Sequence, residues 1–209
     1  MTNRPLILAS ASPRRRELLT ALGLAFEVQS SDVDEASDET DPTALVRELA
    51  LRKARAIGEQ TGSDGVVIGA DTIVVLDGAI LGKPRDAADA TAMLGSLRGR
   101  QHEVVTGVAI CADGEQVVDA VTSRVTMREY AAAEVGRYVD GGSPLDKAGA
   151  YAIQDAAFAP VAHCDGCECS VIGLPLWTVA RMLTRSGLRA LDAPTFERCA
   201  DCPERGDQP

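Results

Sequence analysis

The first residues that could do chemistry combine hydroxyl groups with arginines. Ser10 and Ser12 precede Pro13, and an arginine triplet follows at residues 14–16. Ser12 is expected to cap a helix that begins at Pro13. The helix dipole disfavours positive charge in a first turn, so the triplet indicates a negative ligand. Backbone N–H groups and guanidinium donors at a helix start can together bind a phosphate. The alternative is a solvated helix start.

A carboxylate and a cation flank a predicted hairpin. Asp71 interrupts the β-rich run that begins at residue 66, and Lys83 follows the second arm. Asp77-Gly78 is a strong signal for a two-residue hairpin turn, which would bring the ends of the two arms together. Taken singly, Asp71 is an ordinary turn aspartate and Lys83 a surface lysine. The hairpin is what raises both to candidate site residues.

Alternating strands and helices must position these groups. Asp41 and Asp86 are expected to cap two further helices, and Asp113-Gly114 to turn a second hairpin. Because local hairpins are mixed with helices, the sequence predicts an α/β fold with a mixed sheet. The expected strands are 5–9, 26–30, the two arms of 66–81, 103–111, 116–127 and 151–154, and the expected helices are 13–22, one from 42, 86–97, 131–139 and 176–186.

Composition restricts the class of partner. The chain has 209 residues, 45% of them hydrophobic, and a net charge of -10. Binding to an extended nucleic acid rests on many Lys and Arg contacts to phosphates, so we expect no such partner. No apolar run approaches the ~20 residues of a membrane span, and no secretory segment is recognised, so we expect a cytoplasmic protein without a membrane partner. Local arginines in an acidic chain suit a compact anion such as a nucleotide.

The cysteines form a separate pattern near the carboxyl end. Cys164 and Cys167 are spaced as C-x2-C, and so are Cys199 and Cys202. Two such pairs resemble the ligands of a structural zinc ion, with Cys169 and His163 as substitute ligands. Free thiols and disulfides are the alternatives. Cys111 lies in a β-rich run and is interpreted as a core residue.

Six motifs, in this order, resemble the Maf family of nucleoside triphosphate pyrophosphatases. They are SASPRRRELL with the VDE of the acidic loop, ELALRKA, VIGADTIVVLDGAILGKPRDAADATAML, VVTGVAI, PLDKAGAYAIQD and VIGLPL. The resemblance runs from about residue 6 to residue 186. It implies an elongated α/β fold with two lobes around a cleft, a homodimer, and hydrolysis of the phosphoric anhydride bond with Mg²⁺ or Mn²⁺. GADT and AGAYAIQ resemble the branch that acts on dTTP and UTP.

The resemblance also implies roles for individual residues. The triphosphate would be held by cations and a hydroxyl, Asp71 would be the general base, and Glu35 would help to place the metal with Asp71. From spacing alone, Lys53 would be a surface lysine and Glu35 one of many acids in its loop. The implied triphosphate ligands are Ser10, Arg14, Arg15, Lys53 and Lys83, and the implied specificity positions are Arg14, Thr72 and Gln154.

The resemblance ends before the carboxyl-terminal residues. We expect a catalytic domain over residues 1–190 and a polar, cysteine-containing tail over 191–209.

The alternative functions are a regulatory binding protein in septum formation or cell-division arrest, a pyrophosphatase for methylated GTP, and a zinc-bearing interaction module at the carboxyl end. An intact Asp71 with both lysines favours the enzyme, because a protein that only binds needs no general base.

Overall fold

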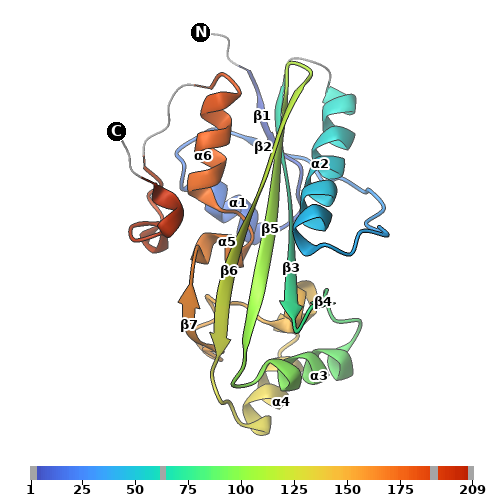
Figure 1. Ribbon diagram of the computed structural model, residues 1–209, viewed down its shortest axis with the longest axis vertical. Helices are drawn as coiled ribbons and strands as arrows, with labels where there is room; N and C mark the ends of the chain where they lie inside the picture. Colours follow the sequence, from blue (N-terminus) through green and yellow to red (C-terminus); the bar gives the residue numbers. More distant parts are fainter. Residues whose placement is uncertain (1–3, 62–64, 189–192, 207–209) are drawn as a thin grey trace.

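A seven-stranded mixed sheet lies at the centre of the protein (Figure 1). The structure is a computed structural model that describes residues 4–61, 65–188 and 193–206. The strand order is β2-β1-β3-β5-β6-β7, with β4 paired to β3. β1 is parallel to β2 and β3, and the other pairs are antiparallel. The strands are β1 (Leu6–Leu8), β2 (Glu27–Val28), β3 (Val66–Leu76), β4 (Ala79–Leu81), β5 (Gln101–Ala112), β6 (Glu115–Met127) and β7 (Val161–Asp165).

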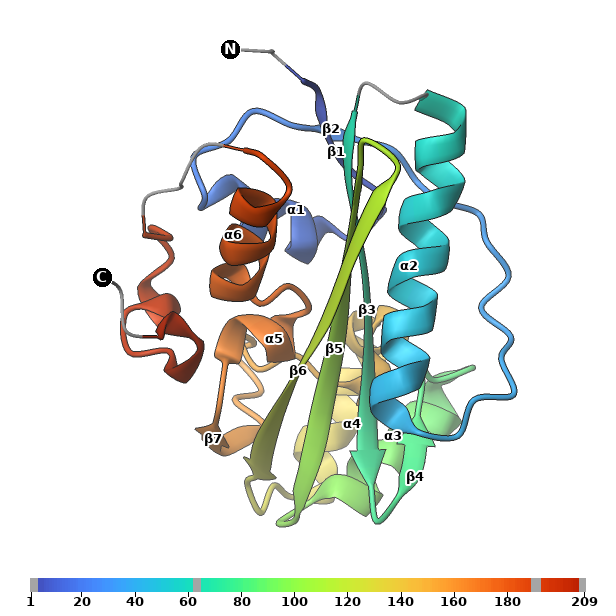
Figure 2. The ribbon, with the colours of Figure 1, turned by 45° about the horizontal axis from the view of Figure 1, so that its top comes forward.

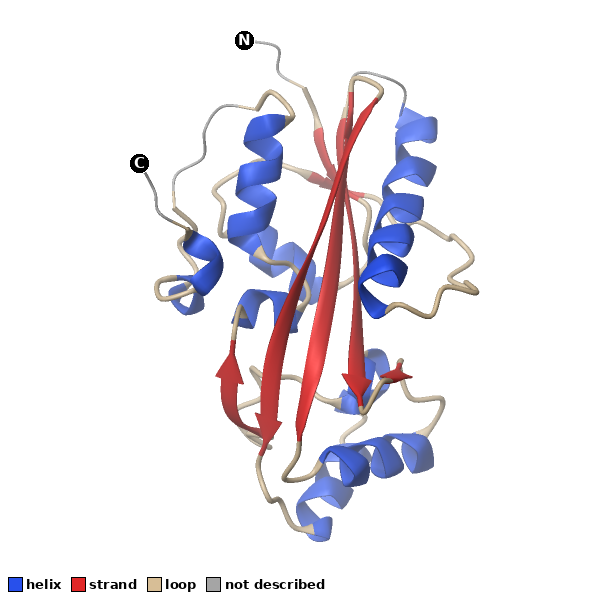
Figure 3. Ribbon diagram, viewed as in Figure 1, coloured by secondary structure: helices blue, strands red, loops and turns tan. Residues whose placement is uncertain are grey.

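Helices cover the sheet in two regions (Figure 2). At one end of the long strands, α1 and α6 pack on one face and α2 on the other. At the opposite end, α3 and α4 pack against β3, β5 and β6 around a second core. Figure 3 shows these two groups of helices at either end of the strands, which gives two lobes joined by the sheet. The helices are α1 (Pro13–Thr20), α2 (Pro42–Thr61), α3 (Ala87–Leu97), α4 (Ala132–Asp140), α5 (Glu168–Ile172) and α6 (Leu176–Arg185), with short 3-10 helices η1 (Ser143–Asp146), η2 (Ala148–Ala150), η3 (Glu197–Cys199) and η4 (Pro203–Arg205).

Caps and turns follow the sequence closely, and the predicted α/β fold with a mixed sheet is confirmed. Ser12 accepts from the amide of Arg15 at the start of α1, and Asp86 caps α3. In both hairpins the central Asp and Gly have positive φ, 50° and 81° at Asp77-Gly78 and 53° and 77° at residues 113–114. This is the backbone conformation of the two-residue turn that a right-twisted hairpin favours.

One predicted strand is wrong, and two elements were not predicted. Residues 151–154 form turns and loop rather than a strand. Gly149 and Ala150 directly before them have φ of 66° and 64°, so the chain turns into the core beside α3 and α4, where Tyr151 is buried. This core and its lobe are called lower below, and the core beside α1 and α6 and its lobe are called upper. The two elements that were not predicted are β7 and α5, where cysteines and acids obscure the apolar pattern of residues 161–172.

Glycines let α2 approach the sheet closely. A Cβ at Gly69 on β3 would lie 2.2 Å from the carbonyl oxygen of Ala50, and one at Gly107 on β5 would lie 2.2 Å from that of Val46. The helix backbone therefore rests directly on two strands, and this contact fixes the position of Lys53 one turn further along α2. Within the described residues, no helix has both the length and the apolar composition to cross a membrane.

Candidate active site

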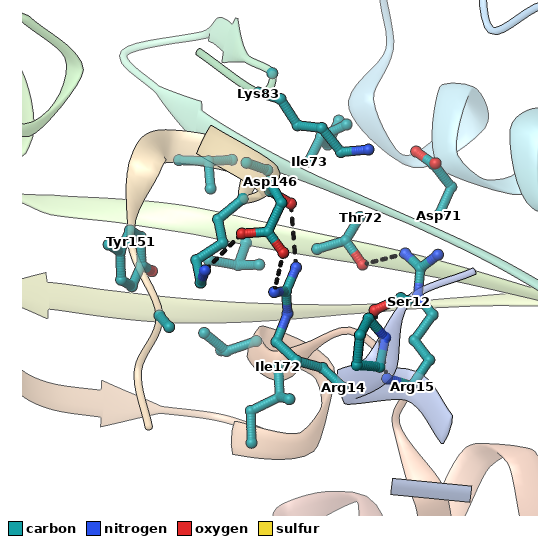
Figure 4. Close-up of a pocket in the computed structure, with 18 of the residues that line it drawn as sticks. Ser12, Arg14, Arg15, Asp71, Thr72, Ile73, Lys83, Asp146, Tyr151 and Ile172 are labelled. Atoms are coloured by element: carbon teal, nitrogen blue, oxygen red, sulfur yellow. Dashed lines mark hydrogen bonds and ion pairs between the residues drawn. The ribbon is translucent and has the colours of Figure 1, made fainter. Parts of the chain in front are cut away.

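A cavity of about 470 Å³ lies between the two lobes, against the middle of the sheet. The start of α1, the middle of β3 and the segment from η1 to residue 154 line it, together with α5 and Lys83 after β4. Charged groups from segments far apart in the sequence therefore face one space. Figure 4 shows Arg14 and Arg15 entering from one side, with Asp71, Thr72 and Lys83 across from them.

Arg15 is held rigidly at the floor of the cavity. Its Nε donates to the carbonyl oxygen of Gly173 at 2.9 Å, and its Nη2 donates to the hydroxyl of Thr72 at 3.1 Å. Its Nη1 lies 3.4 Å from the Ser10 hydroxyl. Burial lowers the pKa of Arg15, but a guanidinium stays charged. Three of its five N–H groups are bound to protein, so two remain for an anion.

Arg14 reaches across the cavity to the opposite lobe. Its Nη1 pairs with Asp146 at 2.6 Å, and Nη2 donates to the carbonyl oxygen of the same residue at 3.2 Å. Lys147 Nζ contacts the other carboxylate oxygen at 2.5 Å. Burial alone would raise the pKa of Asp146, but the hydrogen bonds from Lys147 and Arg14 outweigh it and lower the pKa. This ion pair joins α1 to η1 across the mouth of the cavity.

Two carboxylates meet at one ammonium group. Lys53 Nζ lies 2.7 Å from Glu35 Oε1 and 2.5 Å from Asp71 Oδ1, and Lys53 and Asp71 are both buried. Burial acts to raise the pKa of Glu35, yet its hydrogen bond to Lys53 and the charges of Lys53, Lys83 and Arg15 lower it on balance. Glu35 is therefore ionised at neutral pH. Asp71 Oδ1 and Glu35 Oε1 both point to the place that the ammonium occupies.

Lys83 brings an ammonium group to the cavity. This group makes no hydrogen bond to the described residues. It extends from the segment after β4 toward Asp71 (Figure 4), and it lines the cavity. The hairpin around Asp77-Gly78 thus brings Asp71 and Lys83 to the same cavity, as the sequence predicted. An ammonium without a protein acceptor is available to an anionic ligand.

Two polar side chains complete the lining. The hydroxyls of Thr72 and Thr106 lie 2.9 Å apart, and Thr106 also donates to the carbonyl oxygen of Ser170 at 2.8 Å. Gln154 lines the cavity, and its Oε1 is buried without a hydrogen-bond partner among the described residues. A buried acceptor without a donor costs free energy, so this oxygen favours a ligand with an N–H group.

The cavity is lined by the predicted residues Arg14, Arg15, Glu35, Lys53, Asp71, Thr72, Lys83 and Gln154, whereas Ser10 does not line it and lies 3.4 Å from Arg15. Sequence reasoning gave no role to Asp146, Lys147 or Thr106. The first two lie in the motif PLDKAGA, and their acid and base side by side are a signal that could have been used. Thr106 offers no such signal, because only the pairing of β3 with β5 places it opposite Thr72.

The cysteines are arranged differently from the expected zinc set. Cys167, Cys169, Cys199 and Cys202 are all buried in the upper core, whereas Cys164 packs against the lower core. Cys164 therefore lies apart from the other three cysteines of the expected set, and Cys169, one of the two substitutes, lies beside Cys199. The cause is α5: it turns Cys169 inward, while Cys164 lies on β7. His163, the other substitute, is exposed on β7. Cys111 is half-buried on β5.

Comparisons with known proteins identify the family of this chain. A profile described as "Maf-like protein" matches residues 5–186. A protein named dTTP/UTP pyrophosphatase from Symbiobacterium thermophilum is 48% identical over 87% of this chain and 94% of its own, and one from Desulforamulus reducens is 47% identical over 88% and 98%. A third with this name, from Thermomicrobium roseum, is 42% identical over 95% of this chain and 93% of its own. Since the match spans most of the chain and contains every residue that lines the cavity, the chain belongs to the family of Maf-like proteins.

Proposed function

We propose that the protein hydrolyses nucleoside triphosphates, dTTP and UTP foremost, to the nucleoside monophosphate and pyrophosphate. The observation that carries the proposal is the cavity in which Arg14, Arg15, Lys53 and Lys83 face a buried carboxylate, Asp71. Four cations at one cavity suit a polyanion such as a triphosphate. The names of the relatives supply the reaction and the two bases.

The cations have distinct tasks in binding. Arg15 is fixed by Ser10, Thr72 and Gly173, so its free N–H groups are already oriented for phosphate oxygens. Lys83 neutralises further oxygens as a point charge. Groups that are oriented before the reaction stabilise charge that develops on the phosphates without reorganising, which is the main source of rate in phosphoryl chemistry.

Asp71 is placed to act on water. Its carboxylate would take a proton from a water molecule as that water attacks the α-phosphorus, the bond from the α-phosphorus to the bridging oxygen breaks, and pyrophosphate leaves. Before substrate and metal bind, Lys53, 2.5 Å from Asp71, holds the carboxylate in position. After the reaction the proton passes to solvent through the open side of the cavity.

The residues fit a divalent metal when substrate is bound. Asp71 and Glu35 converge on one point and offer the carboxylate oxygens that Mg²⁺ prefers. No group of three or more Asp, Glu, His or Cys side chains in the described part of the chain is arranged to hold a metal by itself. Phosphate oxygens and water would therefore complete the coordination, and Lys53 would move aside. When bound, the ion supplies charge neutralisation for the leaving pyrophosphate.

Gln154 supports a pyrimidine base. Its unpartnered Oε1 can accept from the N3–H of uracil or thymine, while its amide N–H₂ donates to O4 of the same base. Cytosine would need the amide to be flipped, so Gln154 by itself does not decide between the bases. The relatives' names favour dTTP and UTP.

The test is a panel of nucleotides assayed for pyrophosphate release with Mg²⁺ and with Mn²⁺. We expect dTTP and UTP to have the highest kcat/KM, ahead of CTP, ATP, GTP and 7-methyl-GTP. Equal rates for all bases would contradict the role of Gln154, and a preference for methylated GTP would contradict the assigned branch. Release of orthophosphate instead of pyrophosphate would contradict the position of attack.

Three further expectations from the sequence analysis are proposals of the same kind. They are a homodimer, a cytoplasmic location, and a division into a catalytic domain over residues 1–190 and a tail. Light scattering on the purified protein checks the first. The division falls within residues 189–192, which lie outside the described residues.

A further inference from the structure

Four cysteines form one connected group beside α5. Cys169 and Cys199 have their sulfur atoms 2.7 Å apart, and Cys167 and Cys202 are buried in the same core, where Cys167 is close enough to interact with both Cys169 and Cys202. None of the four residues is more than 5% exposed. All four sulfurs are linked through Cys167 and Cys169, so they are one cluster rather than two separate pairs. The segments 167–169 and 199–202 contribute two sulfurs each.

The tail has little apolar surface besides its cysteines, with Phe196 partly buried against the same core. Between residues 193 and 206, Cys199 and Cys202 are the only buried residues, and the rest are half-buried or exposed. Polar contacts at the rim include the indole N–H of Trp177 donating to the carbonyl oxygen of Cys199 at 3.0 Å, and Arg181 with Glu204 at 3.1 Å. Figures 1 and 2 both show this segment beside α6. The fully buried residues of this segment are two cysteines, and they lie against two more, so the cysteines are the main point at which the segment is anchored.

We propose that Cys167, Cys169, Cys199 and Cys202 bind one zinc ion, which attaches the carboxyl-terminal tail to α5. A closed set of four thiolates is a usual ligand set for structural zinc. Cys199 and Cys202 lie beyond residues 5–186 that the family profile matches, so this site is separate from the nucleotide cavity.

The sulfurs must separate to admit the ion. Two thiolates on one tetrahedral zinc lie about 3.8 Å apart, because each Zn–S bond is about 2.3 Å. At 2.7 Å, the sulfurs of Cys169 and Cys199 are too close for that geometry, which agrees with the absence of a ready metal site among the described side chains. A separation of about 1 Å is within the reach of a rotation about χ1. The amide of Ser170, 3.3 Å from the Cys167 sulfur, is placed to donate to a thiolate there.

Zinc in this position closes a loop that contains α6. Cys169 and Cys199 are joined by 29 intervening residues that include the whole of Leu176–Arg185. Such a closure restricts the unfolded chain, and the free energy of metal binding then adds to the stability of the fold. The tail would stay attached without a large apolar surface of its own.

The experiment is metal analysis of protein purified under reducing conditions, with cobalt substitution to identify the ligands. We expect about one zinc per chain, and the visible absorption of tetrahedral, sulfur-bound Co²⁺ in the substituted protein. Cys202→Ser and Cys169→Ser should each lose most of the metal. Cys164→Ser and Cys111→Ser, which remove cysteines outside the cluster, should keep it.

Several results would overturn the site. Mass spectrometry of the unreduced protein could detect a disulfide between Cys169 and Cys199. That disulfide, together with the absence of zinc, would mean that a covalent cross-link and not a metal ion attaches the tail to α5. Absence of zinc with six titratable thiols would leave it as ordinary core. Metal that is lost in Cys164→Ser but kept in Cys169→Ser would overturn the ligand set. Because these measurements use no nucleotide, they are independent of the proposed activity.

Discussion

At the residue scale, a single ammonium group balances the charge of the Asp71 carboxylate. Asp71 is 8% exposed and has one ammonium at 2.5 Å, and that ammonium is shared with Glu35. A buried carboxylate needs such a partner, because an unpaired charge inside a protein is costly. The same pairing holds the Asp71 carboxylate at the cavity, where it can accept a proton.

We expect Asp71→Asn to reduce kcat by ~10²- to 10⁴-fold, the usual contribution of a general base. The amide keeps the shape of the side chain, so nucleotide binding should persist. Asp77→Asn is the control: Asp77 lies in the exposed hairpin turn of the same sheet, and asparagine tolerates its positive φ. Pyrophosphate release and nucleotide binding are measured for both variants. Turnover of Asp71→Asn within a few fold of the wild type would remove Asp71 from the mechanism.

The arginine triplet contains its own control. Arg14 and Arg15 line the cavity, whereas Arg16 is exposed on α1 and does not. We expect Arg14→Ala to lower kcat/KM for triphosphates at least tenfold, with a weaker dependence of KM on salt, and Arg16→Ala to change little. Arg14→Lys should retain only part of the wild-type kcat/KM, because an ammonium lacks the paired donors of the guanidinium group. Equal effects at residues 14 and 16 would mean that only the overall charge of the helix start matters.

At the scale of elements, the contact between α2 and the sheet determines where Lys53 lies. Glycine at residues 69 and 107 lets the helix backbone approach β3 and β5 to a distance at which no Cβ fits. Lys53 then reaches Asp71 on β3 from a helix that sequence patterning marks only as buried. The acidic loop before α2 brings Glu35 to the same ammonium.

We expect Gly69→Ala to lower the free energy of unfolding by about 3 kcal/mol or more, because the new Cβ would lie 2.2 Å from a backbone oxygen of α2. Gly58→Ala is the matched control. Gly58 lies on α2 with nothing within 4 Å of the place where a Cβ would lie, so alanine there should stabilise by about 0.5–1 kcal/mol. Denaturant unfolding of the two variants measures both. Similar stabilities would show that α2 can shift away from the sheet without cost.

At the scale of the whole molecule, β3 and β5 run through both lobes, and the cavity lies where the two cores meet. The chain is acidic overall, with a net charge of -10, yet the side chains that line the cavity include more cations than carboxylates. The local charge at the cavity is therefore positive, which favours an anionic ligand. His102 on β5 is part of the lower lobe. Its Nε2 lies 2.8 Å from the hydroxyl of Tyr151, which lines the cavity.

We expect His102 to make the fold sensitive to mild acid. Burial lowers the pKa of His102 from 6.5 to about 4, so between these values the unfolded chain binds a proton that the folded protein does not. Stability is therefore retained above pH 6.5 and falls as the pH drops toward 4, by about 2 kcal/mol between pH 7 and pH 5. His102→Gln should remove this part of the loss, while His163→Gln, at the other histidine, which is exposed, should not. The free energy of unfolding of the wild type and of both variants is measured at pH 7 and at pH 5. The same loss of stability in all three proteins would contradict the role of His102.

The sequence by itself determined the local structure and most of the site residues. Ser12, Asp41 and Asp86 cap helices as predicted, and two Asp-Gly turns close hairpins, because caps and tight turns depend on neighbouring residues alone. Motif resemblance supplied Glu35 and Lys53, which spacing could not single out.

Only the tertiary structure decided which distant groups meet. The pairing of β3 with β5 placed Thr106 against Thr72, and the bridge from Arg14 to Asp146 joined segments 132 residues apart. It also placed Cys169 rather than Cys164 beside Cys199, since the short helix α5 directs one sulfur to the upper core and the preceding strand directs the other to the lower core. The spacing of a motif records distance along the chain, whereas a ligand set depends on which face of its element each side chain occupies.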